Sequence, residues 1–331
     1  MSYNAAQFDT FVDNVERTVL EQVKETKPDM VRSLYLDLPW SPGEGDTVTF
    51  NSIALSPFGA RVAENEKYPA VNPVEGPELS KRQVQYGLRM NVTRRMAKFN
   101  RYTEAKFTAA ALAKGLSDQL DLEMTYQIFQ GANQVSMAVA NQPSASIATA
   151  DGLALASASH SFNGKTGSNI MTAAALSLPQ FNLAIQQMTE NTYDDYGRNI
   201  MPNPNTIVIG PDQFMLQKAA QLIGSSLTPE DANNSVNIYK GAGWKIIQLK
   251  HGLKVPNTGA IDTSFRYYWA IMDSEMVRGN FQLKVAEAPS PERTTPDNEN
   301  VLATLAVTQF AAFAAIRPQG TIYNFSTAQP S

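Results

Sequence analysis

The longest regular pattern of this chain runs over residues 103–131, TEAKFTAAALAKGLSDQLDLEMTYQIFQG. Large apolar residues recur there at unbroken four-residue steps: Leu112, Leu116, Leu120, Met124 and Ile128. This spacing places them on one face of an α-helix, which Ala105, Phe107 and Ala109 widen near its start. Thr103 is a suitable N-cap and Gly131 a suitable stop. We predict a core helix over 103–130, about 28 residues and roughly 42 Å long.

A projecting pair of strands is predicted just before this helix. Residues 47–50 have strand composition, and residues 83–92 alternate with a period of two, as a half-exposed strand does. The polar, proline-rich residues between them are expected to form a loose tip. A two-stranded hairpin is only marginally stable alone, so it needs another surface.

The N-terminal segment carries one narrow apolar stripe. Its members lie three or four residues apart and precede Pro28: Phe8, Phe11, Val12, Val15, Val19 and Val23. The spacing predicts a helix that depends on a partner surface. Two interpretations stay open, a helix docked on its own domain and an arm lying on a neighbouring subunit.

The rest of the chain alternates between predicted strands and helices. Helices are expected at 178–189 and 213–223, and strands at 206–209, 244–249, 267–272, 281–285 and within 301–325. Such alternation indicates a compact α/β unit.

Composition excludes several classes of function. The absence of cysteine excludes disulfides, thiolate metal sites and a cysteine nucleophile, and two histidines, His160 and His251, cannot form a three-histidine metal site. The net charge of −4 argues against a broad basic DNA-reading face. The longest uncharged apolar stretch, 301–316, is shorter than the ~20 residues of a membrane span. We expect no membrane association.

Three short motifs carry weak chemical signals. Gly164-Lys165-Thr166 lacks the preceding glycine of a phosphate-binding loop. Ser159-His160-Ser161 lacks a nucleophile elbow, so we expect a polar loop. Asp194-Asp195 lacks a third oxygen donor at a set spacing, so we expect a solvated turn. We therefore predict no catalytic residues, no cofactor and no metal site.

Charge is distributed unevenly. Residues 1–80 hold 13 acids and 6 bases, a net of −7, whereas residues 81–106 hold 8 bases and one acid, a net of +7. The basic stretch is consistent with a solvated face, with nucleic-acid binding, or with attraction between acidic and basic parts of separate copies. Such attraction between copies would determine how they align more than how tightly they bind.

The order of these segments resembles the Hong Kong 97-type major capsid protein of tailed bacteriophages over essentially the whole chain. The residues that carry the resemblance, besides the long helix, are Tyr68-Pro69 through Gly76-Pro77, Tyr86-Gly87 with Val92-Thr93, Ser159-His160-Ser161 with Gly167-Ser168-Asn169, Pro202 through Pro211, and Tyr268-Trp269-Ala270-Ile271 with Asp273.

The resemblance implies an α+β fold in four parts. These are an N-terminal arm (1–45), an extended β-hairpin loop (46–101), a peripheral domain (102–140 and 279–316) with the spine helix 103–130, and an axial α/β domain (141–278 and 317–331). It also implies hexamers and pentamers that form an icosahedral shell around double-stranded DNA, in a virion assembled in the host cytoplasm. Other implied partners are scaffolding, portal and decoration proteins, with DNA contacted non-specifically from the interior.

The contacts between subunits are expected at charged residues of the loop and of the helix entry: Glu64, Glu66, Lys67, Arg82, Arg94, Arg95 and Arg101. Because the sequence starts at Met1 with an arm-like helix, we expect any scaffold to be a separate protein. Some relatives crosslink a loop lysine to an asparagine. Lys67 or Lys81 would suit, but the required glutamate cannot be identified, so we predict no crosslink.

Three alternatives remain. An encapsulin shell has the same fold but encloses an enzyme cargo. A soluble α/β hydrolase would use Ser159 and His160, and a DNA-binding protein would use the basic stretch 81–106. Particle size distinguishes a shell from an enzyme, and salt-sensitive duplex binding by the subunit would identify the third.

Overall fold

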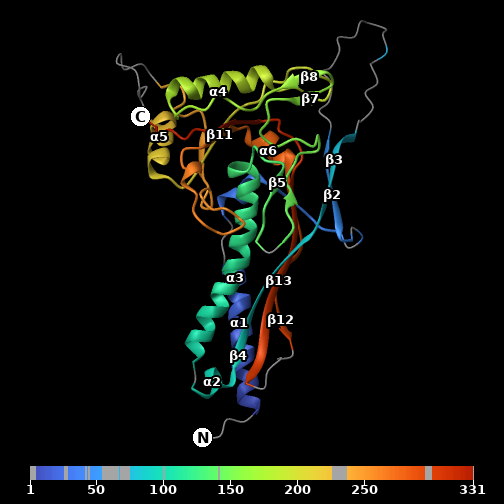
Figure 1. Cartoon of the computed structure of the whole chain (residues 1–331), viewed down its shortest axis with the longest axis vertical. Helices are drawn as coiled ribbons and strands as arrows, with labels where there is room; N and C mark the ends of the chain where they lie inside the picture. The colour runs from blue at the N-terminus through green and yellow to red at the C-terminus, as the bar shows by residue number, and fades with distance from the viewer. Residues whose placement is uncertain are drawn as a thin grey trace.

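The chain folds into an elongated molecule with a broad upper part, a narrow stalk and a hairpin beside them (Figure 1). The structure, a computed structural model, describes residues 5–25, 29–41, 43, 45–53, 67, 75–99, 101–140, 142–225, 237–294 and 300–330.

The stalk contains a four-stranded sheet and two long helices. The strand order is β1 (Leu36–Leu38), β12 (Phe281–Thr294), β13 (Val301–Ala315) and β4 (Val84–Thr93). Strand β1 runs parallel to β12, and the other pairs are antiparallel. Helices α1 (Ala5–Glu25) and α3 (Tyr102–Thr125) lie along the sheet (Figure 1).

The predicted long helix is present, but its ends differ from expectation. Arg101 is the N-cap and makes no side-chain capping bond, so the prediction of Thr103 was wrong. At the other end α3 continues into a π-helical turn, η2 (Tyr126–Gln130). The N–H of Gly131 donates to the carbonyl of Tyr126 over 2.8 Å and ends it. A Cβ on Gly131 would lie 2.2 Å from the Tyr126 ring, so a larger residue there would displace that ring.

Small residues let α1 and α3 approach closely. Val12, Val15 and Val19 of α1 belong to the same buried cluster as Ala105 and Ala109 of α3. This confirms the stripe at these valines and shows that they pack on the stalk of their own chain, whereas the side chains of Phe8 and Val23 lie outside the described part. Phe107, which we expected to widen the stripe of α3, is instead 73% exposed.

The upper part is built on a second sheet, in the order β10 (Lys245–Gln248), β9 (Thr206–Ile209), β11 (Trp269–Met272) and β14 (Thr321–Asn324). Helices α4 (Leu178–Asn191) and α5 (Gln213–Gly224) pack on it through a second buried cluster, which includes Phe181, Met215 and Trp269. The predicted alternation of strands and helices is confirmed here, except that the strand predicted at 281–285 belongs to the stalk sheet as part of β12.

The projecting hairpin exists, but its second strand was predicted wrongly. Strand β2 (Thr47–Ile53) pairs with β3 (Glu75–Arg82), whereas residues 84–93 form β4 and pair with β13. The reason is burial: Tyr86, Met90 and Val92 of β4 reach the core beside α3. Strand β3 is polar and contains Pro77, and both features let a strand stay exposed without pairing to further strands.

The remaining elements are short. They are η1 (Met30–Leu34), α2 (Arg94–Lys98), β5 (Ser136–Met137), β6 (Ala145–Ser146), β7 (His160–Phe162), β8 (Lys165–Gly167), η3 (Thr263–Phe265) and α6 (Ser274–Asn280). The division of the chain into the four parts named above stays a prediction.

We expect Leu120→Ala to destabilise the unassembled chain by about 2–5 kcal/mol, because Leu120 is fully buried and its loss leaves a cavity in the stalk. The exposed Phe107→Ala is the control, with an expected change within about 0.5 kcal/mol. Urea unfolding followed by circular dichroism measures both. Equal effects would contradict this account of the core.

Candidate interaction surfaces

The hairpin β2–β3 contacts the body along a narrow strip at its base. Val48 and Phe50 are fully buried there, and the residues they meet belong to the end of β13 and its extension: Ala312, Ala314 and Ile316. Thr49 and Ser80 face away from this strip, and their hydroxyls lie 3.4 Å apart on the exposed side. Much of the hairpin surface is therefore open to a partner.

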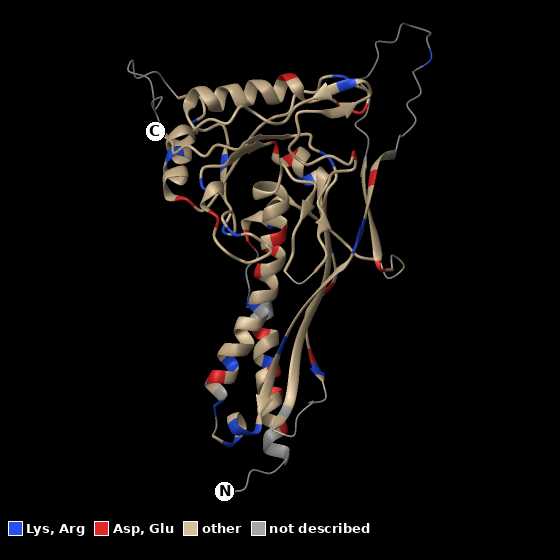
Figure 2. Cartoon of the chain, viewed as in Figure 1, with Lys and Arg blue, Asp and Glu red and all other residues tan. Residues whose placement is uncertain are grey.

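Basic side chains gather at the lower end of the stalk, around α2 (Figure 2). We call this set the basic end: Arg94, Arg95, Lys98, Arg101 and Lys106. Helix α2 begins there because the Thr93 hydroxyl accepts a hydrogen bond from the Met96 N–H. The Arg94 N–H donates to the carbonyl of Asn300 over 2.9 Å, which fixes α2 to the end of the sheet.

Arg94 and Arg95 are exposed, and neither forms an ion pair with any residue that the structure describes. Arg101 pairs with Glu104 at 3.3 Å on the surface. Arg82 lies far from them on the hairpin and pairs with Asp46 at 2.6 Å. Exposed pairs of this kind contribute only about 0–1 kcal/mol, so these arginines can exchange partners cheaply.

The remaining predicted contact residues, Glu64, Glu66 and Lys67, lie between β2 and β3 in the sequence. Lys67 is exposed. Glu64 and Glu66 lie outside the described residues. The structure thus brings Arg94, Arg95 and Arg101 together at the basic end and keeps Arg82 apart from them on the hairpin.

Two exposed phenylalanines accompany the basic end and were missed as contact candidates. Phe99 is 64% exposed and Phe107 is 73% exposed. The helical periodicity had placed Phe107 in the core. Exposed apolar side chains rimmed by polar residues mark interaction sites where they form a continuous patch, so we add Phe99 and Phe107 to the contact candidates.

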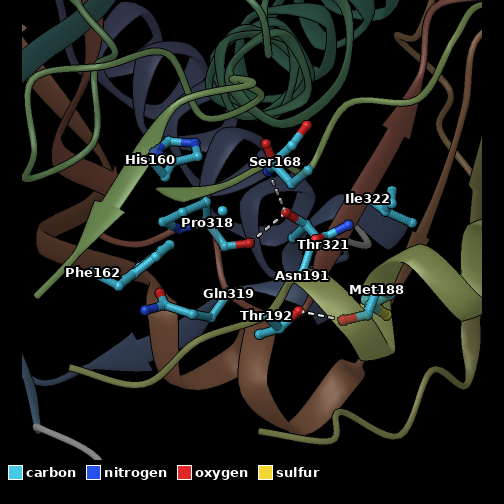
Figure 3. Close-up of a pocket in the computed structure, with 12 residues that line it drawn as sticks. His160, Phe162, Ser168, Met188, Asn191, Thr192, Pro318, Gln319, Thr321 and Ile322 are labelled. Atoms are coloured by element: carbon cyan, nitrogen blue, oxygen red, sulfur yellow. Dashed lines mark hydrogen bonds between the residues drawn. The ribbon is translucent and has the colours of Figure 1, made fainter. Parts of the chain in front are cut away.

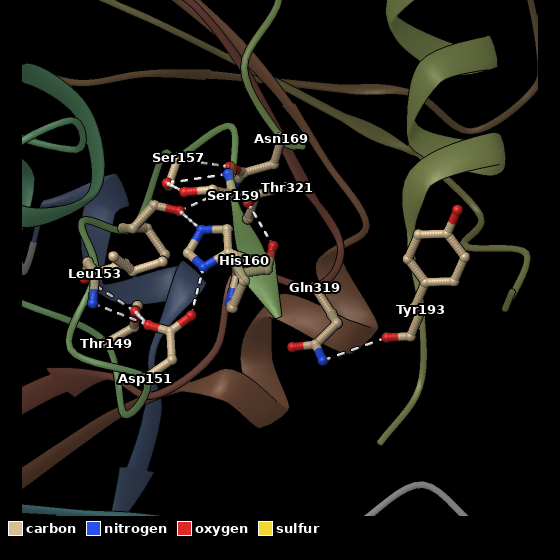
Figure 4. A network of polar contacts seen from close by, with 12 residues as sticks. Thr149, Asp151, Leu153, Ser157, Ser159, His160, Asn169, Tyr193, Gln319 and Thr321 are labelled. Atoms are coloured by element: carbon tan, nitrogen blue, oxygen red, sulfur yellow. Dashed lines mark hydrogen bonds and ion pairs between the residues drawn. The ribbon is translucent and has the colours of Figure 1, made fainter. Parts of the chain in front are cut away.

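His160 lies in a buried polar network instead of a polar loop (Figure 4). Its Nδ1 lies 2.6 Å from an Asp151 carboxylate oxygen, and its Nε2 lies 3.2 Å from the carbonyl oxygen of Leu155. Both partners are acceptors, so each ring nitrogen can donate one hydrogen bond when it carries a hydrogen. The Ser159 hydroxyl contacts Ser157, and no hydrogen bond joins it to His160. These residues do not form the serine–histidine pair of a hydrolase.

Asp151 is held ionised by this network. Burial raises the pKa of its carboxyl, but hydrogen bonds from His160, the Thr149 hydroxyl and the Leu153 N–H outweigh burial and lower the pKa to about 2. Asn169 extends the network, since its amide nitrogen donates to the Leu155 carbonyl and to the Thr321 hydroxyl. The network therefore joins the loop before β7 to strand β14.

The cavity beside this network is small (Figure 3). Its volume is about 20 Å³, and His160, Asn169 and Thr321 are among its lining residues. That is room for about one water molecule. The cavity lined by His160 is therefore too small for an organic ligand.

The two other weak motifs also have structural roles. The chain turns between β7 and β8 at Asn163 and Gly164, both with positive φ, so Gly164-Lys165-Thr166 belongs to a tight hairpin. Asp194 is buried and bonded to Arg198, and Asp195 pairs with Arg317 at 2.9 Å. The prediction of a solvated turn for Asp194-Asp195 was wrong, because Asp194 is buried against Arg198 of the same turn and Asp195 pairs with the distant Arg317.

Metal-binding and membrane-spanning features were also sought in the part of the chain that the structure describes. No group of three acidic or imidazole side chains there is arranged to hold a metal ion. No helix there combines the length and the apolar character needed to cross a bilayer.

A scan against protein-family models finds no match to this chain, and a search of curated proteins finds none either. The solved structures do give matches. A chain from Gordonia phage Cozz is 12% identical, aligns over 92% of this chain and 88% of its own length, and gives a TM-score of 0.53.

Two further structures extend this likeness. A chain in the capsid structure of the cyanophage P-SCSP1u is 13% identical over 91% of this chain and 88% of its own, with a TM-score of 0.53. A chain of the virus-like particle from Pyrococcus furiosus is 10% identical over 94% and 98%, with a TM-score of 0.50. These likenesses confirm the predicted α+β fold of the Hong Kong 97 type.

We expect Asp151→Asn to lower stability at neutral pH and to weaken the acid sensitivity of the chain. A folded-state pKa of about 2, below the ordinary 3.8, means that the ionised carboxylate stabilises the fold. That contribution is present above the ordinary value and is lost as the pH falls through about 2. Unfolding curves between neutral and strongly acidic pH measure it. Asp37→Asn, at an exposed position of β1, is the control, and the proposal fails if both variants behave alike.

Proposed function

We propose that this chain is the major capsid protein of a tailed bacteriophage. The observation that carries the proposal is the agreement of its fold with phage and capsid structures over about nine-tenths of the chain. Identities of 12–13% support the fold only, so the function rests on the fold together with the surfaces described above.

The shape of the subunit favours self-association. The hairpin buries one side of β2 on the body and leaves the other side exposed. A two-stranded element gains stability when a further surface covers it. A second copy offers such a surface at every position of a closed shell, because heterologous contacts repeat around symmetry axes.

The basic end offers a second contact in the same assembly. Arg94 and Arg95 have no ion-pair partner among the described residues and adjoin the exposed Phe99 and Phe107. An acidic surface of a neighbouring copy would pair with the two arginines and bury the two phenylalanines. Burial of one phenylalanine contributes about 1.5–3 kcal/mol, and the charges mainly select the register.

In finer detail, we infer hexamers and pentamers that close into an icosahedral shell around packaged double-stranded DNA. Scaffolding, portal and decoration proteins would be its further partners, and assembly would take place in the host cytoplasm before the protein enters the virion. A structural role without catalysis accords with His160 and Ser159, whose hydrogen bonds leave no catalytic pair.

A shell with a protein cargo is the second candidate. It is favoured by the likeness to the virus-like particle from Pyrococcus furiosus, which covers 98% of that chain. The two candidates differ in their contents. Nuclease-protected DNA inside particles made during phage infection supports the first candidate, and a co-purifying protein cargo without DNA supports the second.

Size-exclusion chromatography and negative-stain microscopy of the expressed protein test the shared claim. We expect closed particles, or capsomers that convert to particles, eluting far ahead of the 36.2 kDa of a single chain. A protein that stays monomeric at high concentration, under all conditions of salt and pH tested, would contradict both candidates.

Arg94→Gln with Arg95→Gln is expected to reduce particle yield strongly while leaving the subunit folded, because the two side chains are exposed and make no ion pair with a described residue. Circular dichroism and particle counts by microscopy measure the two properties. Lys165→Gln with Lys240→Gln removes the same charge at other exposed positions and is the matched control. Normal particle yield from the arginine variant would refute the role of the basic end.

A further inference from the structure

Strand β12 is buried on both faces near its start, and the two faces have different partners. Phe281 and Leu283 point into the main core beneath the helices. The intervening Gln282 and Lys284 point to the other face and are also buried, at 5% and 8% exposure. In the sequence these two residues alternate with apolar ones as solvent-facing residues do. The structure places the hairpin over them instead.

Gln282 and Lys284 hold the free edge of the hairpin. The amide nitrogen of Gln282 donates to the carbonyl oxygen of Asn51 over 3.0 Å. The ammonium of Lys284 donates to the carbonyl oxygen of Thr49 over 3.3 Å and lies 5.8 Å from the centre of the Phe50 ring. Both carbonyls belong to β2, whose only strand partner among the described residues is β3.

Two alanines complete the same surface. Gln282 pairs across the sheet with Ala314, and Lys284 pairs with Ala312. Val48 and Phe50 of the hairpin pack against these alanines. We call Gln282, Lys284, Ala312 and Ala314 the seat of the hairpin. No backbone ladder joins β2 and β3 to the long sheet among the described residues, although β3 runs on into β4 through Gln83. Apart from this covalent link, side chains hold the hairpin on the sheet.

Apolar packing does not fill the space at the base of the hairpin. A cavity of about 540 Å³ lies there, and Asn51, Ser52 and Gln282 are among its lining residues. An element that borders a cavity can tilt into it unless directional bonds hold it, because apolar contact alone has no preferred direction. The hydrogen bonds from the seat supply that direction.

We propose that Gln282 and Lys284, supported by Ala312 and Ala314, are positioning residues that set the angle at which the hairpin leaves the body. The inference rests on the proposed function in one respect: where the hairpin lies on a second copy, its angle fixes the tilt between the two copies. A change at the seat then alters particle geometry without touching the contact surface itself.

The absence of cysteine allows a direct measurement of this angle. Spin labels are attached to Glu78→Cys on the hairpin and Gln217→Cys on α5, both exposed positions. The label-to-label distance distribution is recorded for the unassembled chain. The parent chain is expected to give one narrow distribution.

Lys284→Met keeps an unbranched, mostly apolar side chain that is one heavy atom shorter and removes the donor. Gln282→Met removes the donor beside it at an unchanged side-chain length. We expect both to broaden the distance distribution. Ala312→Leu, which adds volume under Phe50, is expected to shift its mean. Lys114→Met, at an exposed position of α3, should leave the distribution unchanged. Circular dichroism confirms that each variant is folded.

Unchanged distributions in the two methionine variants would overturn the proposal, and so would a shift in Ala312→Leu alone, because packing would then set the angle. Particle diameters from the same variants provide the second readout, and we expect a broader or displaced range. If the parent chain forms no particles, the proposed function fails, while the distance measurement still tests the seat.

Discussion

The architecture depends on the two-sided burial of the first residues of β12. One face closes the core of the stalk through Phe281 and Leu283, and the other face receives the hairpin through Gln282 and Lys284. Burial of a lysine is costly unless its charge finds hydrogen-bond partners. The carbonyl oxygen of Thr49 is one such partner, and it belongs to the hairpin that covers the lysine.

The two ends of the molecule are stabilised by different means. The stalk is held mainly by apolar packing, in which small residues of α3 admit the valines of α1. The upper part adds polar connections in which one partner is buried: Asp151 with His160, and Asp195 with Arg317. From the sequence alone, His160 was a candidate for a hydrolase site and Asp195 was expected in a solvated turn. In the structure these groups hold loops and strands together.

Much of the fold was predictable from the sequence, because the spacing of apolar residues in a long helix shows which of its faces is buried. The four-residue steps of α3 and the valine stripe of α1 are examples. The N-cap was not predictable, since Arg101 contributes no side-chain bond. The partner of β2 was not predictable either, because a period of two fixes a face but not a neighbour. Among the candidate contact residues, charge indicated Arg94 and Arg95, whereas the exposure of Phe99 and Phe107 and the burial of Gln282 could be learned only from the structure.

The separation between the hairpin and its support has a consequence for biosynthesis. Gln282 and Asn51 are 231 residues apart, so the ribosome completes the support long after the hairpin has emerged. At about 5–20 residues per second the delay is roughly 10–50 s. During that time a nascent chain cannot hold its hairpin at the final angle. The hairpin of a nascent chain therefore lacks the side chains that support it until most of the polypeptide has been made.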